Sequence, residues 1–555
     1  MKRCSRLNST VTSEFAEIVR KYPNKKCFLH EDKVWTFKEV DEFSNRVANS
    51  FSKAGYRKGD VVALLMESSP EYVGIWLGLA KVGICSALIN YNLRQKTLIH
   101  SITVSEAKVL IFGKEFINVV KEVQGPLNHD FKYYCFGDFD SNVITAQPLN
   151  KFLEESSVMP PPLVLCNQKD RLMYIYTSGT TGLPKPAIIH HARYIFISAG
   201  IRIMMHVRFN DVIYTPLPLY HSAGGVIGIG QAILAGSTVV IRSKFSASKY
   251  WDDCIKYNCT VAQYIGEICR YLLASPPKPT DTEHRVRLIF GNGLRSQIWK
   301  PFVGRFRVKE IGEIYGSTEG NANIVNIDNQ PNAVGFVSRI APWAYPVTLI
   351  RIDKDTNEPL RDKNGLCIQC KPDEPGEFVG KIINSDPVRD FSGYVNEKAT
   401  EKKIVHSVFR KGDTAFLSGD LLVMDDFGYI YFKDRLGDTY RWRGENVSTI
   451  EVEGVIISLI GLKECTVYGV EVPGCEGRAG MAAIFDEYNT LDLKHLHEVF
   501  MSRTYKLRKV DFQMQGINPK VIKKDKLFYL NSKTSQYEVL DEQVYESICN
   551  EKIRL

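Results

Sequence analysis

The sequence predicts an α/β protein: a large N-terminal domain of two α/β layers with a β-rich subdomain, followed by a small, mobile α+β C-terminal lid. Three observations support this. Short apolar runs alternate with helical stretches up to Phe290, the pattern shortens into β-type runs between Val347 and Ile382, and a charged, glycine-containing stretch begins at Arg435. Alternating strands and helices are typical of sheets covered by helices. With 555 residues, 44% of them hydrophobic, the chain can bury a large core.

The expected elements follow one another along the chain. The first layer has a helix that begins at Pro70, after the helix-start signal Ser69-Pro70, and strands at Val61–Met66, Ala87–Asn90 and Val109–Phe112. The second has a helix at Tyr194–Met205 and strands at Val212–Thr215, Thr238–Ile241 and Leu288–Phe290. The β-rich subdomain has strands at Val347–Ile352, Cys367–Cys370 and Glu377–Ile382, and the lid has strands at Cys465–Val470 and Met481–Phe485.

Composition excludes several classes of protein. Lys+Arg 71 against Asp+Glu 63 gives a net charge of +8, too mild for this length to indicate nucleic-acid binding. The 13 cysteines are scattered, as expected for reduced thiols; Cys367 and Cys370 have metal-type spacing but no second pair, so we interpret them as part of a strand. Met1–Thr12 lacks an apolar core, so we do not expect secretion. Tyr72–Ile89 is interrupted by Lys81 and three glycines, which favours a packed helix and strand over a membrane span.

The most informative segment is the hydroxyl- and glycine-rich run after the apolar strand Leu172–Tyr176. Glycines let backbone N–H groups approach phosphate oxygens, hydroxyls add donors, and a lysine supplies mobile positive charge. The spacing is not that of a Walker A motif, because Leu183 and Pro184 precede the lysine. The run therefore predicts a nucleoside triphosphate site, with a surface loop as the alternative. Its residues are Thr177, Ser178, Gly179, Thr180, Thr181, Gly182 and Lys185.

Five further segments suit a nucleotide and an acyl group. The run 315–319 offers an aromatic face for a base, hydroxyls for phosphate and a carboxylate for Mg²⁺. Asp420 ends a β-type run, where it could hold a ribose diol, and 291–293 follows a strand, where a flat ring could lie against backbone. His221, within Pro218–Gly224, could border an acyl channel. The last segment is charged and covers 432–446. The first of these runs is Tyr315-Gly316-Ser317-Thr318-Glu319, and the third is Gly291-Asn292-Gly293.

Together these segments resemble the adenylate-forming superfamily of acyl-CoA synthetases, luciferases and adenylation domains. The resemblance runs from about Glu14 to Tyr545. Within it, residues 174–185, 314–321 and 434–449 are similar to the fatty acid transport protein and very-long-chain acyl-CoA synthetase branch. The resemblance implies an AMP-binding domain over residues 1–434, a hinge over 435–438 and a lid over 439–555. It also implies that the protein uses ATP, Mg²⁺ and CoA.

The resemblance gives each segment a role in activating a carboxylate. Residues 177–182 would surround the β- and γ-phosphates, and Lys185 would contact these phosphates. Thr177 and Glu319 would hold Mg²⁺. The α-phosphate would contact Thr318, the adenine Tyr315 and residues 291–293, and the ribose Asp420 and Arg435. The remaining ATP contacts would be Gly316 and Ser317. The walls of the acyl channel and of the CoA route would include His221, Gly225, Gln263, Tyr264, Gly444, Glu445 and Asn446.

Two features depart from the branch. The apolar anchoring segment that usually precedes this region is absent, so the resemblance implies attachment to a membrane surface by another part of the chain, or a shortened form. In the lid, no proline lies between Pro473 and Pro519, and the expected helix Leu491–Phe500 runs almost directly into Arg503. We therefore expect a lid shortened before Lys506, and slow adenylation. Lys506 is the candidate adenylation lysine, with an ordinary surface lysine as the alternative.

The leading hypothesis is ATP-dependent ligation of long and very long fatty acids to CoA, coupled to uptake. By resemblance the protein would sit on the cytosolic face of the endoplasmic reticulum, plasma membrane or peroxisome, with a homodimer left open. One alternative is a catalytically weakened, membrane-associated protein that binds or carries fatty acids. Another is a ligase that adenylates a different apolar carboxylate.

Overall fold

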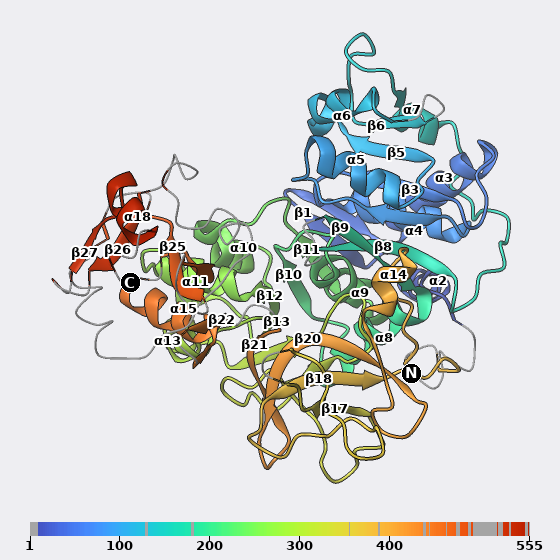
Figure 1. Ribbon diagram of the computed structural model, residues 1–555. Coiled ribbons are helices and arrows are strands. Elements are labelled where there is room, and N and C mark those ends of the chain that lie inside the picture. Colours follow the sequence, from blue (N-terminus) through green and yellow to red (C-terminus); the bar gives the residue numbers. More distant parts are fainter. Residues whose placement is uncertain are drawn as a thin grey trace.

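The computed structural model describes residues 9–127, 131–178, 183–353, 356–386, 389–436, 440–442, 445–461, 463–472, 478–486, 490–491, 526–531 and 536–549, with Pro519, Thr534 and Ile553. Within these residues the strands form three large sheets and three two-stranded sheets (Figure 1). Two large sheets belong to α/β layers, and the third is the β-rich one drawn below them.

The first layer is a seven-stranded sheet in the order β7-β6-β5-β3-β4-β8-β9. Its neighbours pair in parallel except β8 and β9, which are antiparallel. The strands are β3 (Val61–Leu65), β4 (Cys85–Leu88), β5 (Val109–Gly113), β6 (Lys132–Phe136), β7 (Gln147–Pro148), β8 (Arg171–Ser178) and β9 (Pro184–His190). The helices of this part are α3 (Phe37–Lys53), α4 (Pro70–Lys81), α5 (Gln95–Val104), η1 (Lys114–Phe116), α6 (Ile117–Gln124) and α7 (Leu149–Glu154).

The second layer is an eight-stranded sheet in the order β15-β14-β13-β12-β10-β11-β1-β2. The strands are β1 (Lys26–His30), β2 (Lys33–Thr36), β10 (Val212–Thr215), β11 (Thr238–Ile241), β12 (Val261–Ile265), β13 (Leu288–Asn292), β14 (Glu310–Tyr315) and β15 (Ile324–Val325). The helices are α2 (Val11–Lys21), α8 (His191–Met204), the π-helix η2 (Ala223–Gly228), α9 (Ile229–Ala235), η3 (Ala247–Lys249), α10 (Tyr250–Lys256), α11 (Gly266–Ala274), α12 (Thr280–Glu283) and α13 (Ser296–Phe306).

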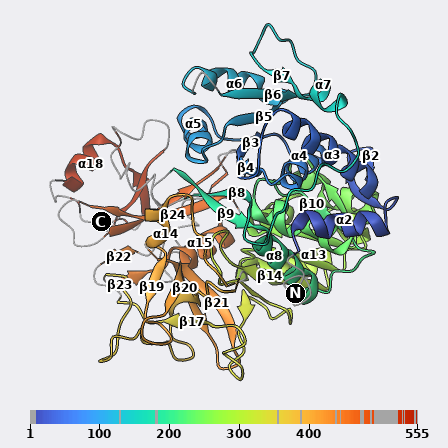
Figure 2. The same cartoon turned by 90° about the vertical axis from the view of Figure 1, so that its right-hand side faces the viewer.

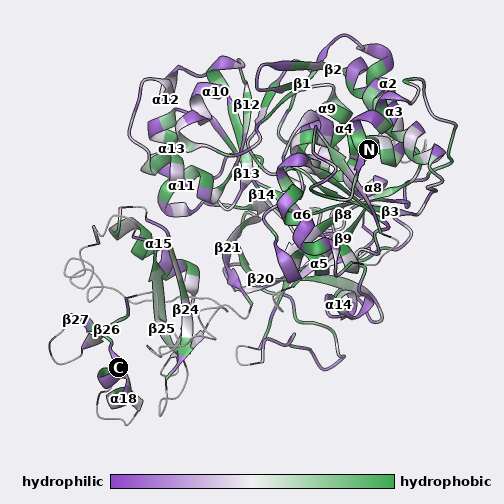
Figure 3. Ribbon diagram, turned by 90° about the horizontal axis from the view of Figure 1, so that it is seen from above, coloured by the Kyte–Doolittle hydropathy of each residue, from purple (hydrophilic) through white to green (hydrophobic). Residues whose placement is uncertain are grey.

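One apolar core joins the two layers. It contains side chains of β3 and α4 from the first layer and of α8, α9 and β11 from the second. The rings of Trp76 on α4 and Tyr194 on α8 lie 5.8 Å apart between their centroids. Apolar segments of both layers appear in Figure 3. Because side chains of both layers share this core, the edges of the two sheets are held in a fixed relation.

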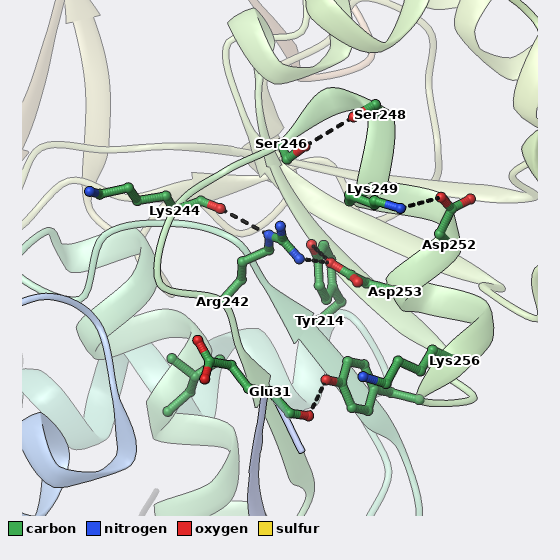
Figure 4. A network of polar contacts seen from close by, with 12 residues as sticks. Glu31, Tyr214, Arg242, Lys244, Ser246, Ser248, Lys249, Asp252, Asp253 and Lys256 are labelled. Carbon is green, nitrogen blue, oxygen red and sulfur yellow. Dashed lines mark hydrogen bonds and ion pairs between the residues drawn. The ribbon is translucent and has the colours of Figure 1, made fainter. Parts of the chain in front are cut away.

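A polar network anchors the loop that follows β11. Asp253 of α10 accepts a hydrogen bond from the Tyr214 hydroxyl at 2.8 Å and pairs with Arg242 at 2.5 Å (Figure 4). Arg242 also donates from Nε to the carbonyl of Lys244 at 2.9 Å. The buried carboxylate thus ties strand β10, the loop after β11 and helix α10 together.

The third large sheet is antiparallel, in the order β16-β21-β20-β18-β17 with β19 added to β20. Its strands are β16 (Gly335–Phe336), β17 (Val347–Ile350), β18 (Gly376–Lys381), β19 (Ile404–His406), β20 (Thr414–Met424) and β21 (Tyr429–Arg435), and it is accompanied by α14 (Glu397–Glu401). The C-terminal elements are β22 (Tyr440–Trp442), β23 (Glu445–Val447), α15 (Thr449–Leu459), β24 (Cys465–Glu471), β25 (Arg478–Ile484), β26 (Phe528–Asn531), β27 (Gln536–Val539) and α18 (Glu542–Cys549). Figure 2 shows them beside the β-rich sheet.

Most of the predicted elements are confirmed, with two corrections, at Cys367–Cys370 and at Asp420, which lies inside β20 and not at the end of a strand. The strands at 212–215 and 238–241 have the predicted bounds, and the helix at Pro70 is capped by Ser69, whose side chain accepts from the Tyr72 N–H at 3.2 Å. The predicted strand Cys367–Cys370 is wrong, because only isolated bridges form there, at Cys367 and Gln369. In the described residues, no cluster of three potential metal-ligating side chains occurs.

The membrane and lid predictions have different outcomes. Among the described helices, none combines the length and apolar character needed to cross a bilayer, and Tyr72–Ile89 forms most of α4 and all of β4. The expected helix at 491–500 lies outside the described residues except Leu491. The division at residues 434 and 438 stays a prediction.

Candidate functional site

A cavity of about 1600 Å³ lies where the three large sheets meet. Its polar part is lined from β8, β9, the segment after β14, β18 and β20; the residues include Thr177, Lys185, Ser317, Thr318, Glu319, Glu377 and Asp420. Its apolar part is lined mainly by α8 and by the segments around η2 and β15; the residues include Phe196, Ile197, Gly200, Ile201, Met204, Ile227 and Val325. One continuous space therefore offers both charged and apolar walls.

The segment after β14 is held from behind by Arg193 of α8. This side chain is only 6% exposed. Its guanidinium donates to the carbonyls of Ser317 at 3.1 Å and Thr318 at 2.8 Å, and also to that of Gly320. Burial lowers the pKa of Arg193 to about 10. Five donors in a rigid planar group fix the segment so that its hydroxyls face the cavity.

Glu319 is tied to the opposite wall through Tyr394. The Tyr394 hydroxyl donates to Glu319 Oε1 at 2.7 Å, and Thr177 is a further hydrogen-bond partner of this phenol. Burial and the nearby carboxylate raise the pKa of Tyr394. Glu319 and Thr177, predicted together as the Mg²⁺ site, thus lie on either side of one tyrosine.

Asp420 lies in the middle of β20, where the pairing register with β18 shifts, and not at the end of a strand as predicted. It accepts from the Tyr315 hydroxyl at 2.6 Å, and Arg435 Nε approaches its other oxygen at 3.5 Å. Burial raises the pKa of Asp420. Glu377 of β18 fixes the backbone next to Asp420, because it accepts a hydrogen bond from the Gly419 N–H at 2.9 Å. Gly419 has φ +79°, a conformation that favours glycine.

Residues 291–294 lie at the end of β13. We call the backbone of this segment the shelf. Gly291 and Asn292 line the cavity. A Cβ at Gly291 would lie 2.0 Å from the carbonyl oxygen of Tyr264, so only glycine lets the two strands approach this closely. From β14, Glu313 accepts from the N–H groups of Gly293 and Leu294.

The predicted acyl wall combines glycines with internally bonded polar groups. A Cβ at Gly225 in η2 would lie 2.2 Å from the Leu219 carbonyl oxygen. Gln263 is buried; it accepts from Thr215 at 2.8 Å and donates to the carbonyl of Ala223 at 2.9 Å. Its amide is therefore occupied by the protein and positions the wall. Burial lowers the pKa of His221, so this cavity-lining imidazole is neutral at pH 7.

The structure gathers many of the predicted site residues around one cavity. Those that line it are Thr177, Lys185, His221, Gln263, Tyr264, Gly291, Asn292, Gly316, Ser317, Thr318, Glu319, Asp420 and Arg435. Ser178 ends β8, and Glu445 and Asn446 belong to β23. Gly179–Gly182, Gly444 and Lys506 lie outside the described residues. Tyr315 packs its ring on Phe378, with centroids 5.6 Å apart.

The sequence matches the family model for AMP-binding enzymes over residues 15–379. It is 48% identical to long-chain fatty acid transport protein 1 of Rattus norvegicus over 99% of this chain and 89% of that protein, and equally identical to the Homo sapiens protein. The protein belongs to the fatty acid transport protein family of AMP-binding enzymes. Another family member, long-chain fatty acid transport protein 2 of Rattus norvegicus, is 40% identical over 98% of this chain and 92% of that protein.

Solved structures show that this fatty acid transport protein homologue has the fold of adenylate-forming enzymes. An anthranilate CoA ligase bound to anthranoyl-AMP superposes with a TM-score of 0.74 at 20% identity, covering 90% of this chain and 92% of that one. ATP-bound MatB of Rhodopseudomonas palustris superposes with a TM-score of 0.72 at 21% identity, covering 90% and 94%. The predicted fold class and family are confirmed.

Sequence reasoning missed four residues that shape this site: Arg193, Glu313, Glu377 and Tyr394. Arg193 directly precedes the predicted helix Tyr194–Met205 and lies next to its apolar residues, which was a usable signal, because a buried guanidinium needs several acceptors. Glu313 lies two residues before the motif that begins at Tyr315, on a strand buried on both faces. Tyr394 had no sequence signal, since it acts from the segment between β18 and α14, 75 residues along the chain from Glu319.

Proposed function

We propose that the protein activates long- and very-long-chain fatty acids with ATP and Mg²⁺ to acyl-adenylates, transfers the acyl group to CoA, and thereby drives fatty acid uptake. The observation that carries this proposal is the single cavity, which joins an oxygen- and lysine-lined end to a channel of apolar side chains. A long acyl chain and a nucleotide require these two surroundings side by side.

The residues of the polar end suit the first half-reaction. A fatty acid carboxylate attacks the α-phosphorus of ATP, and pyrophosphate leaves as the acyl-adenylate forms. Charge on the phosphates has to be neutralised during this step. Lys185 is the lysine nearest in sequence to the phosphate-loop motif and lines the cavity, and Thr318 presents its hydroxyl to the same space beside Ser222, 3.3 Å away.

The donors present suit Mg²⁺. Glu319 contributes carboxylate oxygens and Thr177 a hydroxyl, which are hard ligands. Mg²⁺ in nucleotide sites is commonly held by one or two carboxylates together with substrate phosphates, which fits a single carboxylate here. When bound, the ion would neutralise phosphate charge. Asp420 would accept hydrogen bonds from the ribose hydroxyls, and Arg435 would hold that carboxylate in place.

The second half-reaction requires CoA to reach the adenylate. The C-terminal elements contribute to the cavity, since Thr466 of β24 lines it, and Arg295 pairs with Glu453 of α15 at 2.9 Å. We propose that the lid over 439–555 turns about residues 435–438, so that Gly444–Asn446 serve the CoA route and Lys506 serves adenylation.

Membrane attachment is a separate part of the proposal. Ile340 and Trp343 are 90% and 76% exposed, and Phe427 of a neighbouring loop is 79% exposed. The two loops are joined by Arg339, which pairs with Asp426 at 2.9 Å. Val337, at the start of the first loop, donates to the Gly428 carbonyl at 2.9 Å. Exposed aromatic and aliphatic side chains on adjoining loop tips suit insertion among lipid headgroups.

Fatty-acid-dependent pyrophosphate release with ATP and Mg²⁺, measured with and without CoA across chain lengths, tests the proposal. We expect release with long acids and acyl-CoA when CoA is added. Glu319→Gln should abolish release, whereas Glu283→Gln, an exposed carboxylate on α12, should not. Bound fatty acid without pyrophosphate release would instead establish a binding or trafficking protein.

Flotation with phosphatidylcholine vesicles tests membrane attachment. We expect the double variant Trp343→Ser and Phe427→Ser to bind fewer vesicles than the native protein. The double variant Leu163→Ser and Leu165→Ser, which removes comparably exposed apolar side chains elsewhere, should bind normally. Equal flotation of all three proteins would exclude these loops.

A further inference from the structure

Glu313 is a buried carboxyl group that connects the shelf with the acyl wall. It lies on β14 and is 1% exposed. One oxygen accepts from the N–H groups of Gly293 and Leu294, the latter at 3.1 Å, and the other accepts from the Tyr264 hydroxyl. Tyr264 itself lines the cavity. The Glu313 side chain therefore contacts both the shelf, through Gly293 and Leu294, and the acyl wall, through Tyr264.

The surroundings of Glu313 are polar but contain no balancing charge. Among the described residues it forms no ion pair with a lysine, arginine or histidine. The titratable groups that face it are the Tyr264 phenol on β12 and the Cys269 thiol on α11, and its charge contributes to raising the pKa of both. Burial raises the pKa of Glu313 to about 8. Hydrogen bonds, rather than a salt bridge, hold this carboxyl in place.

The shelf leaves little room for movement. Gly293 has φ +80°, and a Cβ at Gly266 would lie 1.7 Å from the Gly293 carbonyl oxygen. Close backbone approach therefore confines the shelf from the α11 side, while Glu313 holds the N–H groups of Gly293 and Leu294 toward β14. Loss of the carboxyl would leave the buried Leu294 N–H and the partly buried Gly293 N–H without this partner, and such groups move to regain one.

We propose that Glu313 is a positioning residue for the nucleotide base: it fixes the height of the shelf against which the base lies and couples the shelf to the acyl wall through Tyr264. This inference rests on the proposed function for the identity of the ligand. It assigns to Glu313 no contact with the substrate and no proton transfer. Its contribution is geometric, so an uncharged side chain of the same shape can replace it.

Glutamine at position 313 can make all three contacts. Its carbonyl oxygen can accept from Gly293 and Leu294, and its amide can donate to the Tyr264 oxygen, because a phenol oxygen also accepts. Aspartate keeps the carboxyl group but is one methylene shorter, so its oxygens withdraw from the shelf. Glu313→Gln therefore removes the ionisable group and keeps its position, whereas Glu313→Asp keeps the group and changes its position.

The test is calorimetric binding of AMP and of inorganic pyrophosphate to the full-length protein. We expect Glu313→Asp and Glu313→Ala to weaken AMP binding roughly tenfold or more and to leave pyrophosphate binding unchanged. Glu313→Gln should bind both ligands as the native protein does. Glu310→Ala, an exposed carboxylate on the same strand, is the matched control and should also be unchanged.

Several outcomes would overturn the inference. Equal weakening of AMP and pyrophosphate binding would indicate a general structural role. A Glu313→Gln protein as defective as Glu313→Asp would show that the ionisable carboxyl group itself is needed, and normal AMP binding by Glu313→Asp would show that the contact is dispensable. If Glu313→Ala does not fold, the Asp and Gln variants still decide. Binding needs no turnover, so a native protein that binds AMP without activating fatty acids would refute the proposed function alone.

Where activity is present, the KM values give a second readout. Glu313→Asp should raise the KM for ATP and for the fatty acid together, because one side chain holds both walls. Tyr264→Phe, which removes only the phenol contact, should raise the KM for the fatty acid and leave the KM for ATP unchanged. A change confined to kcat in both variants would contradict the coupling.

Discussion

The two ends of the cavity are built by different means. At the polar end, buried side chains behind the wall hold each segment by hydrogen bonds, as Arg193 does for residues 317–320. At the apolar end, one face of α8 and side chains around η2 and β15, among them Ile227 and Val325, define the space. A segment that moves at the polar end leaves buried polar groups without hydrogen-bond partners. The geometry of this end is consequently fixed. When the apolar end changes its dimensions, it loses van der Waals contacts between side chains but no hydrogen bonds.

Replacing Arg193 should produce the largest effect. Arg193→Met removes the donor to the carbonyls of Ser317, Thr318 and Gly320, so we expect fatty-acid-dependent pyrophosphate release to fall about 100-fold or more. Arg202→Met is the control, because Arg202 is an exposed arginine of the same helix that donates to the Leu234 carbonyl. A near-native rate of pyrophosphate release by Arg193→Met would show that the polar end does not depend on this buried side chain, and the difference between the two ends would be refuted.

Filling the apolar end should change specificity without changing nucleotide binding. Gly200 lines the cavity, and a Cβ there would meet only Met204, at 3.5 Å. Gly200→Leu should therefore be accommodated while shortening the channel, lowering kcat/KM for the longest acids roughly tenfold and leaving the KM for ATP unaltered. Gly304→Leu, on the exposed side of α13 with no atom within 4 Å, controls for leucine in a helix. Unchanged chain-length preference would remove α8 from the acyl site.

The smallest expected effect is on the pH dependence of stability. Burial raises the pKa of Glu377 from 4.5 to about 7, so the folded protein retains a proton that the unfolded chain loses. This contribution to the free energy of unfolding is complete below about pH 4.5 and is lost as the pH rises through 7. Glu377→Gln should remove that loss, on the order of 1–3 kcal/mol. Melting temperatures measured from pH 4.5 to 8 would show a flatter profile than the native protein; parallel profiles would refute it.

Sequence reasoning was accurate where a single segment carries its own signal. The strands Val212–Thr215 and Thr238–Ile241 are continuous apolar runs, as expected for strands covered on both faces, and the motif residues 316–319 do line one cavity. It failed at Cys367–Cys370, where apolar alternation is present but no neighbouring strand supplies a continuous ladder.

Long-range partners could not be predicted from one sequence. Arg193 acts on carbonyls about 125 residues away in the chain, and Tyr394 reaches Glu319 from the segment between β18 and α14. Neither contact leaves a local pattern. The phosphate-loop residues 179–182 and Lys506 remain predictions, since they lie outside the described residues.

The position of the first hairpin has a consequence for biosynthesis. Strand β1 pairs in parallel with β11, Phe28 against Val239, at one side of the second sheet. The hairpin emerges early from the ribosome, but its partner strand is translated more than 200 residues later. At roughly 5–20 residues per second, this corresponds to a delay of about 10–40 seconds. During that interval the apolar face of the hairpin has no sheet to join, which makes this segment a natural binding site for chaperones on the nascent chain.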